Sequence, residues 1–257
     1  MDIIVTHDNY TGAVTAENER YRITIQRDED AESPREWDDN VGTMVCAHQR
    51  YILGDEQAQG THNYSSWREW FEDNILVPDL DMELEDNPDM YDPDPISSSR
   101  RYTESWVFNE ERAAEERARR IQEAEENIVY LALFLYDHSG ITMYTVDTRA
   151  LYYQHEAWDS GQVGYIYVHK ADALKEWGEE EWRERATNYL NGEVKTYDAY
   201  LRGDIIGYTI EGVADDNDGY YDGCWGIYPD EDGHFRPWLD ADIPEDAHEL
   251  LDEMNIR

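Results

Sequence analysis

The chain of 257 residues carries 60 acidic and 21 basic residues, a formal net charge of -39. A surface this acidic should repel nucleic acid, which proteins bind mainly through Lys and Arg contacts with phosphate, so we expect no direct nucleic-acid binding. Apolar residues make up 40% of the chain and aromatic residues 13%, too many core-forming side chains for a disordered acidic protein.

Lysine is nearly absent from the chain, which adds to the information in its net charge. The chain has only three lysines, Lys170, Lys175 and Lys195, and this composition indicates a halophilic source. At about 1 M salt the Debye length is only about 3 Å, so repulsion between exposed carboxylates is largely screened. At low ionic strength the same charge opposes a compact state. A second interpretation stays open, in which the carboxylates imitate the phosphates of a nucleic acid.

The ends and the cysteines of the chain give further expectations. No apolar run reaches the roughly 18 residues of a membrane helix, so we expect no membrane contact. The first residues, MDIIVTHDNY, lack the basic and apolar regions of a signal peptide. We therefore expect a protein of the host cytoplasm, with the virion as an alternative location. Cys46 and Cys224 are predicted to be free, buried thiols.

The first half of the chain alternates between strand patterns and polar turns. Residues 20–27 have apolar side chains at every second position, which predicts a half-buried strand. Residues 41–46 predict a second short strand. A helix is expected over residues 65–76, capped by one of its two leading serines and with three large aromatic side chains on one face.

The next stretch changes character. Residues 77–99 contain four prolines and many carboxylates without a usable period, which predicts an exposed loop. Residues 105–127 predict a long helix rich in Glu–Arg pairs three or four positions apart. Its thin apolar stripe consists of Ala114, Ala118 and Ile121. We therefore expect residues 77–127 to form an acidic loop and a surface helix, inserted into a single domain of residues 1–257.

The second half begins with the most apolar run of the chain. Residues 128–136, IVYLALFLY, predict a buried central strand that forms a hairpin with residues 141–146. The other elements expected are a strand at 163–168, helices at 170–177, 179–189 and within 192–202, a hairpin of 204–211 with 220–228, and a helix after Pro244. Hairpins outnumber crossover units, so the fold class is α+β, a mainly antiparallel sheet with flanking helices.

Several uncommon segments occur in order along about half of the chain. They are DEDAESPREWDDNVGTMVCAHQRYILGD at residues 28–55, LFLYDHSGITM at 133–143, WDSGQVGYIYVHK at 158–170, EVKTYDAYLRGDIIGYTIE at 193–211 and DGCWGIY at 222–228. Together they resemble an uncharacterised family of tailed phages and other mobile elements. The resemblance implies a viral or plasmid accessory protein and implies no particular activity.

Few residues suggest catalysis. No phosphate-binding loop, dinucleotide fingerprint or complete zinc motif is present, so no cofactor or metal is predicted. Asp137 and His138 follow the apolar strand, and an aspartate can orient a histidine that acts as a general base or binds a metal. If Asp159 converged with them, a metal-assisted hydrolase would follow. The alternative is a strand-ending turn in which these side chains cap backbone groups.

Three other residues are candidates for contact with a partner. Trp158 and Gln162 lie in a polar cluster between strands, and Trp37 lies in an acidic stretch. Tryptophan is enriched at protein-binding hot spots. The alternative for both tryptophans, and for Trp225, is core packing.

Three functions remain open from the sequence. The favoured one is a non-enzymatic accessory protein of a halophilic virus or mobile element, which binds a host or viral protein. In its sharper version the protein is an acidic nucleic-acid mimic directed against host defence. The alternatives are the metal-assisted hydrolase and a structural component of the virion. The oligomeric state is not predicted.

Overall fold

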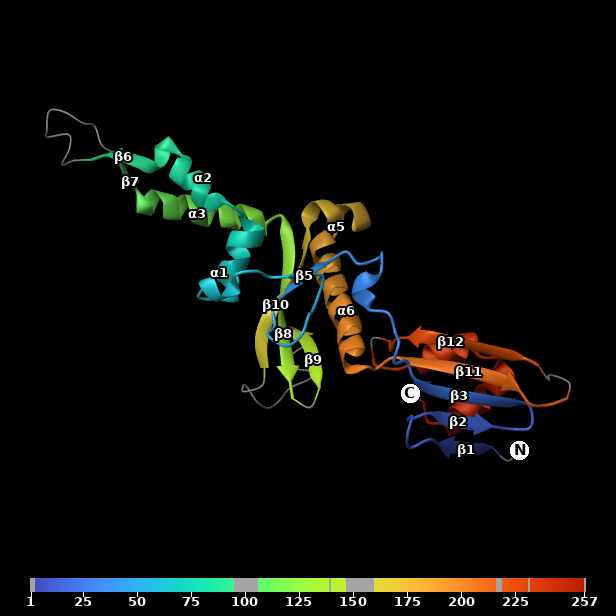
Figure 1. Cartoon of the computed structure of the whole chain (residues 1–257). Helices are drawn as coiled ribbons and strands as arrows, with labels where there is room; N and C mark the ends of the chain where they lie inside the picture. Colours follow the sequence, from blue (N-terminus) through green and yellow to red (C-terminus); the bar gives the residue numbers. More distant parts are fainter. Residues whose placement is uncertain are drawn as a thin grey trace. The chain divides into compact units, whose positions relative to one another are not determined.

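The computed structural model describes residues 3–94, 106–138, 140–146, 160–215, 219–230 and 232–256 (Figure 1). The strands of this part form two five-stranded sheets and a two-stranded ribbon, mostly with antiparallel pairing. The α+β class predicted from the sequence is thereby confirmed. The chain divides into two compact units, one of residues 1–40, 133–161 and 189–257, the other of residues 41–132 and 162–188. The expectation of a single domain with an insertion stays a prediction.

The first sheet, all antiparallel, has the strand order β1-β2-β3-β11-β12. Its strands are β1 (Ile4–His7), β2 (Val14–Glu17), β3 (Tyr21–Arg27), β11 (Ile206–Gly212) and β12 (Tyr221–Ile227). The predictions of a strand at 20–27 and of the last hairpin are confirmed. The first two strands were not expected, because their short alternating patterns lie among polar turns.

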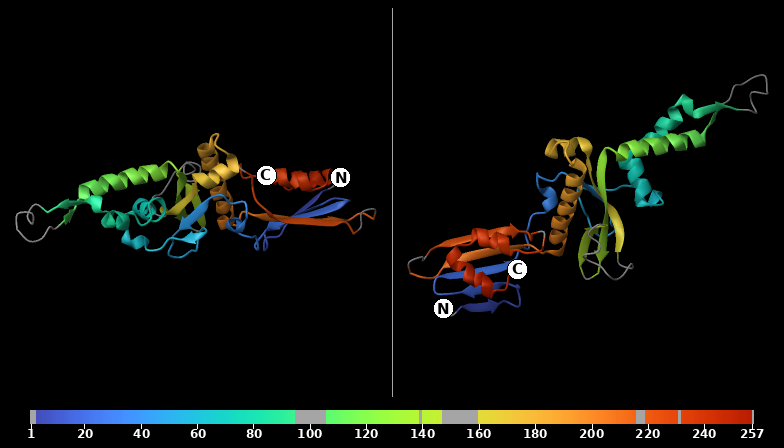
Figure 2. Two further views of the ribbon diagram at one scale, coloured as in Figure 1. Left: turned by 90° about the horizontal axis from the view of Figure 1, so that it is seen from above. Right: turned by 180° about the vertical axis from the view of Figure 1, so that it is seen from behind.

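One face of the first sheet is buried and the other is polar. Tyr21, Ile23 and Ile25 alternate along β3 and are all buried. They pack with Leu239 of helix α7 (Arg236–Asp242) and with residues of helix α8 (His248–Glu253). These C-terminal helices cover one face of the sheet (Figure 2). Full burial of one such apolar side chain stabilises the fold by about 1.5–3 kcal/mol.

The second sheet has the strand order β5-β4-β10-β8-β9. Its strands are β5 (Glu56–Gln57), β4 (Thr43–Cys46), β10 (Ser160–His169), β8 (Ile128–Asp137) and β9 (Ile141–Thr145). The predicted apolar strand β8 lies inside the sheet and pairs antiparallel with β9, as expected. Cys46 is buried in β4, whereas Cys224 is only partly buried, and both thiols are free. The prediction of a buried thiol is therefore confirmed for Cys46 and wrong for Cys224, which lies on the edge strand β12.

The remaining described elements are mainly helical. They are η1 (Pro34–Glu36), η2 (Thr61–Asn63), α1 (Trp67–Phe71), the π-helix η3 (Glu72–Leu76), α2 (Leu80–Asp86), η4 (Pro88–Met90), α3 (Glu110–Glu125), α5 (Lys170–Trp177), α6 (Trp182–Arg202) and η5 (Glu245–Ala247). The ribbon pairs β6 (Tyr91–Pro93) with β7 (Trp106–Phe108). In the described part of the chain, no helix has both the length and the apolar character needed to cross a membrane.

Three details of the helices differ from expectation. Residues 77–99 are not only a loop, because Leu80 and Leu84 lie one turn apart on α2 and are buried with Ala113. The buried residue of α3 is Ala113, whereas the predicted Ala114 and Ala118 are exposed; Ile121, the third residue of the predicted stripe, is partly buried and packs against the core. A single helix, α6, replaces the two expected, since buried side chains on both sides of Gly192 outweigh the roughly 1 kcal/mol that a helical glycine costs.

Candidate functional site

Two of the three predicted catalytic residues, Asp137 and His138, lie in the described part of the chain. Asp137 ends β8 and is half-buried, and the exposed His138 follows it with its ring 6.2 Å from that of Tyr136. Asp159 lies outside the described residues. Within the ranges that the structure describes, no group of three or more His, Cys, Asp or Glu side chains could hold a metal ion. Convergence of the three residues stays a prediction.

The predicted partner-binding residues have different surroundings. Trp158 also lies outside the described residues. Gln162 belongs to β10, where its carbonyl accepts a hydrogen bond of 2.9 Å from Trp67 Nε1 and its side chain donates to Gly164 O at 3.3 Å. Trp37 is 37% exposed, and its ring makes an edge contact with Tyr228 at a centroid distance of 5.0 Å. Trp37 is therefore packed on one side and open on the other.

Trp37 belongs to an acidic stretch, residues 28–40, which we call the acidic segment. Its carboxylates are Asp28, Glu29, Asp30, Glu32, Glu36, Asp38 and Asp39, and all except Asp28 are exposed. Those six exposed carboxylates form no ion pair with any residue in the described ranges. The segment therefore presents a dense negative charge directly to solvent.

The acidic segment is held in place by hydrogen bonds to its backbone. Asp28 N–H donates to Ile205 O at 2.9 Å, next to β11. The hydroxyl of Tyr228 donates to Glu32 O at 2.9 Å, and that of Tyr189 on α6 donates to Asp39 O at 2.8 Å. Burial, aided by nearby negative charges, raises the pKa of Tyr228 to about 12, so this phenol remains a donor at neutral pH.

The single arginine of the segment forms its strongest attachment. Arg35 pairs with Glu193 of α6 at 2.5 Å, and the two side chains are only 5% and 6% exposed. A second bond of 3.0 Å runs from Arg35 to Asn40 Oδ1, while Asn40 Nδ2 donates to Pro34 O and to Trp37 O. The sequence did not predict this pair, although a lone arginine among seven carboxylates was a visible signal.

A groove of about 780 Å³ lies where the acidic segment begins. It is lined by the turn residues Tyr10 and Thr11, by residues 26–30 and by Trp225 of β12. Trp225 is 47% exposed, which contradicts the alternative of core packing for this side chain. The groove therefore combines an open indole with the carboxylates of residues 28–30.

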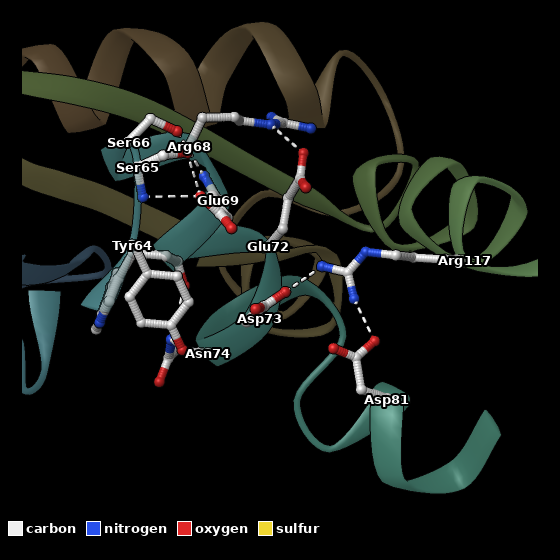
Figure 3. Close-up of polar contacts among 11 residues, drawn as sticks. Tyr64, Ser65, Ser66, Arg68, Glu69, Glu72, Asp73, Asn74, Asp81 and Arg117 are labelled. Atoms are coloured by element: carbon white, nitrogen blue, oxygen red, sulfur yellow. Dashed lines mark hydrogen bonds and ion pairs between the residues drawn. The ribbon is translucent and has the colours of Figure 1, made fainter. Parts of the chain in front are cut away.

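The second unit shows the opposite use of charge. Around α1 and η3, Arg68 bonds to Glu72 at 2.6 Å and to Glu125 at 2.8 Å, and Arg117 of α3 lies between Asp73 and Asp81 (Figure 3). Burial opposes the charged form of Glu125, but the hydrogen bonds from Arg68 and Tyr130 and the charge of Arg68 together outweigh it and lower the pKa of this carboxyl. These carboxylates are paired with nearby arginines of the same unit. The network therefore stabilises the helices and does not form an open charged site.

Comparison of the chain with protein-family models, with curated proteins and with solved structures finds no match. The likeness to a family of tailed phages and mobile elements therefore remains an expectation from the sequence segments alone.

Proposed function

We propose that this protein is a non-enzymatic accessory protein of a halophilic virus or mobile element and that it acts by binding another protein. The observation that carries this proposal is the acidic segment, where six exposed carboxylates lie on a backbone held by the hydroxyls of Tyr189 and Tyr228 and by the buried pair of Arg35 with Glu193. A surface that is ordered before binding loses little conformational entropy when a partner docks. The indole of Trp37, within the segment, and that of Trp225, beside it, add the aromatic contacts that are enriched in binding hot spots.

The charge of the segment points to a basic partner surface. Complementary charge speeds encounter and selects the partner, more than it adds affinity. In concentrated salt the long-range part of this attraction is screened, so contacts at short range must supply the selectivity. The exposed carboxylates of the segment and the partly exposed indoles of Trp37 and Trp225 provide such contacts.

The nucleic-acid mimic remains a sharper version of the same proposal. It requires a row of carboxylates unbroken by positive charge. Helix α3 is unsuited to this role, because six glutamates alternate with four arginines along it and several of them are paired. The acidic segment suits it better, because its only arginine is buried.

A binding experiment with charge-matched variants tests the proposal. The full chain is immobilised in 2 M KCl and exposed to lysate of a salt-grown host, and the captured protein is identified, purified and titrated. One variant neutralises Glu29, Asp30, Glu36 and Asp38 of the acidic segment as amides. Its control neutralises the exposed Glu176, Glu179, Glu180 and Glu184, which changes the charge by the same amount in the other unit.

We expect the segment variant to bind the partner about tenfold more weakly and the control to bind it like the parent chain, since each rim charge contributes roughly 0.2–1 kcal/mol. Equal weakening by both variants would indicate a general charge effect and contradict the proposal. Competition between the chain and duplex DNA for the partner would support the mimic version.

A further inference from the structure

The groove beside β12 is built around one side chain, Trp225. Ile206 pairs with Ile227 and Tyr208 with Cys224, so two residues of β12, Trp225 and Gly226, face one residue of β11 across a β-bulge. Bulges re-aim side chains and are common next to functional sites. Here the bulge directs the indole back over β11, towards Gly207.

The absence of a side chain at Gly207 leaves the room that the indole of Trp225 occupies. A Cβ atom at this position would lie 2.2 Å from Cε3 of Trp225, so the ring rests directly against the backbone of β11. A glycine within a strand often marks such a close approach. The indole is thereby fixed on one side, while Trp225 as a whole is 47% exposed and lines the groove.

The bulge is also joined to the acidic segment. Gly226 N–H, in the bulge, donates to Asp28 Oδ2 at 2.8 Å. The other oxygen of this carboxylate accepts a bond of 3.1 Å from Asp30 N–H. One aspartate therefore holds the strand that carries the indole and the backbone that carries the next carboxylates, so ring and charges keep a fixed arrangement.

The charge of the groove is unbalanced. Three carboxylates, Asp28, Glu29 and Asp30, face one guanidinium, that of Arg27, which lies 3.7 Å from Asp204. The face of an indole attracts cations, and carboxylates bind guanidinium groups through paired hydrogen bonds. Guanidinium is more weakly hydrated than ammonium and stacks on aromatic rings, so it suits a site that works in strong salt.

We propose that this groove binds an arginine side chain of the partner protein, with the guanidinium on the exposed part of Trp225 and paired with Glu29 or Asp30. This inference rests on the proposed function, because it gives the chemistry by which the protein-binding surface recognises its partner.

The test uses a fluorescein-labelled peptide of alternating glycine and arginine, titrated with the full chain in 2 M KCl and followed by anisotropy. A citrulline peptide has the same shape without the charge, and a lysine peptide has the charge without the planar group. We expect the arginine peptide to bind most tightly. Trp225→Ala should weaken its binding about 2- to 30-fold, the range of one cation–π contact.

Matched variants separate this contact from general effects. Trp238→Ala removes another indole of the same unit, 55% exposed on α7 and outside the groove, and should leave binding unchanged. Gly207→Ala keeps the tryptophan but displaces its ring and should weaken binding. The double variant Glu29→Gln/Asp30→Asn changes only exposed side chains, so it should fold normally by circular dichroism and still bind more weakly.

Equal affinity for the arginine and citrulline peptides, or no binding of either, would overturn the inference, as would an equal effect of Trp225→Ala and Trp238→Ala. The two proposals can fail separately. If Trp225→Ala binds the purified partner as well as the parent chain does, the arginine groove is wrong and the protein-binding function stands. If the arginine peptide binds as expected but no partner is captured, the groove stands and the proposed function is contradicted.

Discussion

The acidic segment and helix α3 are both rich in carboxylates, yet they use arginine in opposite ways. In α3 and its neighbours the arginines lie at the surface among the carboxylates, and Arg117 and Arg119 each bind two of them. In the acidic segment the single arginine points inward and binds Glu193 of α6. The position of the arginines therefore decides which acidic groups are structural and which remain available to a partner.

The largest effect should come from removing the inward arginine. Arg35→Met leaves Glu193 buried without its partner, and breaking a buried pair on one side costs about 3–5 kcal/mol. We expect that loss in the free energy of unfolding, measured with urea in 2 M KCl. The double variant Arg35→Met/Glu193→Met removes both charges and should recover most of the loss. Failure of the double variant to recover would mean that the pair is not the attachment we describe.

Asp198 lies on α6, the helix that also carries Glu193. We expect it to make stability depend on pH with the opposite sign to that of most carboxylates. This side chain is 1% exposed, accepts Met143 N–H at 2.8 Å and pairs with Arg202 at 3.0 Å. Burial raises its pKa to about 6, although Arg202 opposes the shift. The folded state therefore holds the proton more firmly than the unfolded state, whose pKa is near 3.9. Stability from this group is greatest below about pH 4 and falls as the pH rises to about 6.

Asp198→Asn removes this titration. Between pH 4 and pH 7 we expect the parent chain to lose about 2–3 kcal/mol of stability relative to the variant, at roughly 1.4 kcal/mol per unit of pKa shift. Urea unfolding of both chains across this range measures the difference. Parallel stability profiles would show that Asp198 titrates normally in the folded state.

Smaller losses are expected in the second unit. The side chain of Arg117 is 24% exposed and binds Asp73 and Asp81, so Arg117→Met should cost about 1 kcal/mol. Arg119 is 51% exposed on the same helix, so solvent screens its pairs and Arg119→Met should lower stability much less than Arg117→Met does. Equal losses for the two variants in urea unfolding would contradict the distinction between half-buried and exposed pairing.

Local patterns were enough to predict much of the fold. The alternation of residues 20–27, the apolar run of 128–136 and the capping serine Ser66 each determine their structure within a few residues, and all three expectations are confirmed. The continuity of α6 was missed, because it depends on which of its side chains become buried. Local pattern gives no information about such contacts.

The site was less predictable for the same reason. Arg35 and Glu193 lie 158 residues apart in the sequence, so their pairing appears only when the chain is folded. The bulge that places Trp225 against Gly207 depends on the register between β11 and β12, which a hairpin prediction does not specify. The sequence did show an acidic stretch with a tryptophan, Trp37, and the structure adds the attachment that makes it an ordered surface.

Removal of single exposed carboxylates should have the smallest effects on stability, and these effects should be measurable at low salt. We expect the fold to lose stability below roughly 0.5 M salt, because unscreened carboxylates repel one another. Neutralising Glu29, Asp30, Glu36 and Asp38 should raise the free energy of unfolding at low salt by roughly a few tenths of a kcal/mol for each group. The loss of stability should therefore begin at a lower salt concentration than in the parent chain. Thermal unfolding in KCl from 0.05 to 3 M measures the shift.

Glu116 on α3 provides the contrasting variant. Hydrogen bonds from Arg119 and then Arg120 lower its pKa to about 2, so its charge is already compensated. Glu116→Gln should therefore give no gain at low salt, and it should remove a contribution to stability that is present above about pH 4.5 and lost as the pH falls towards 2. An equal gain at low salt from Glu116→Gln and from any one neutralisation in the acidic segment would mean that net charge alone matters. Full retention of structure at 50 mM salt would contradict the halophilic interpretation and favour the nucleic-acid mimic.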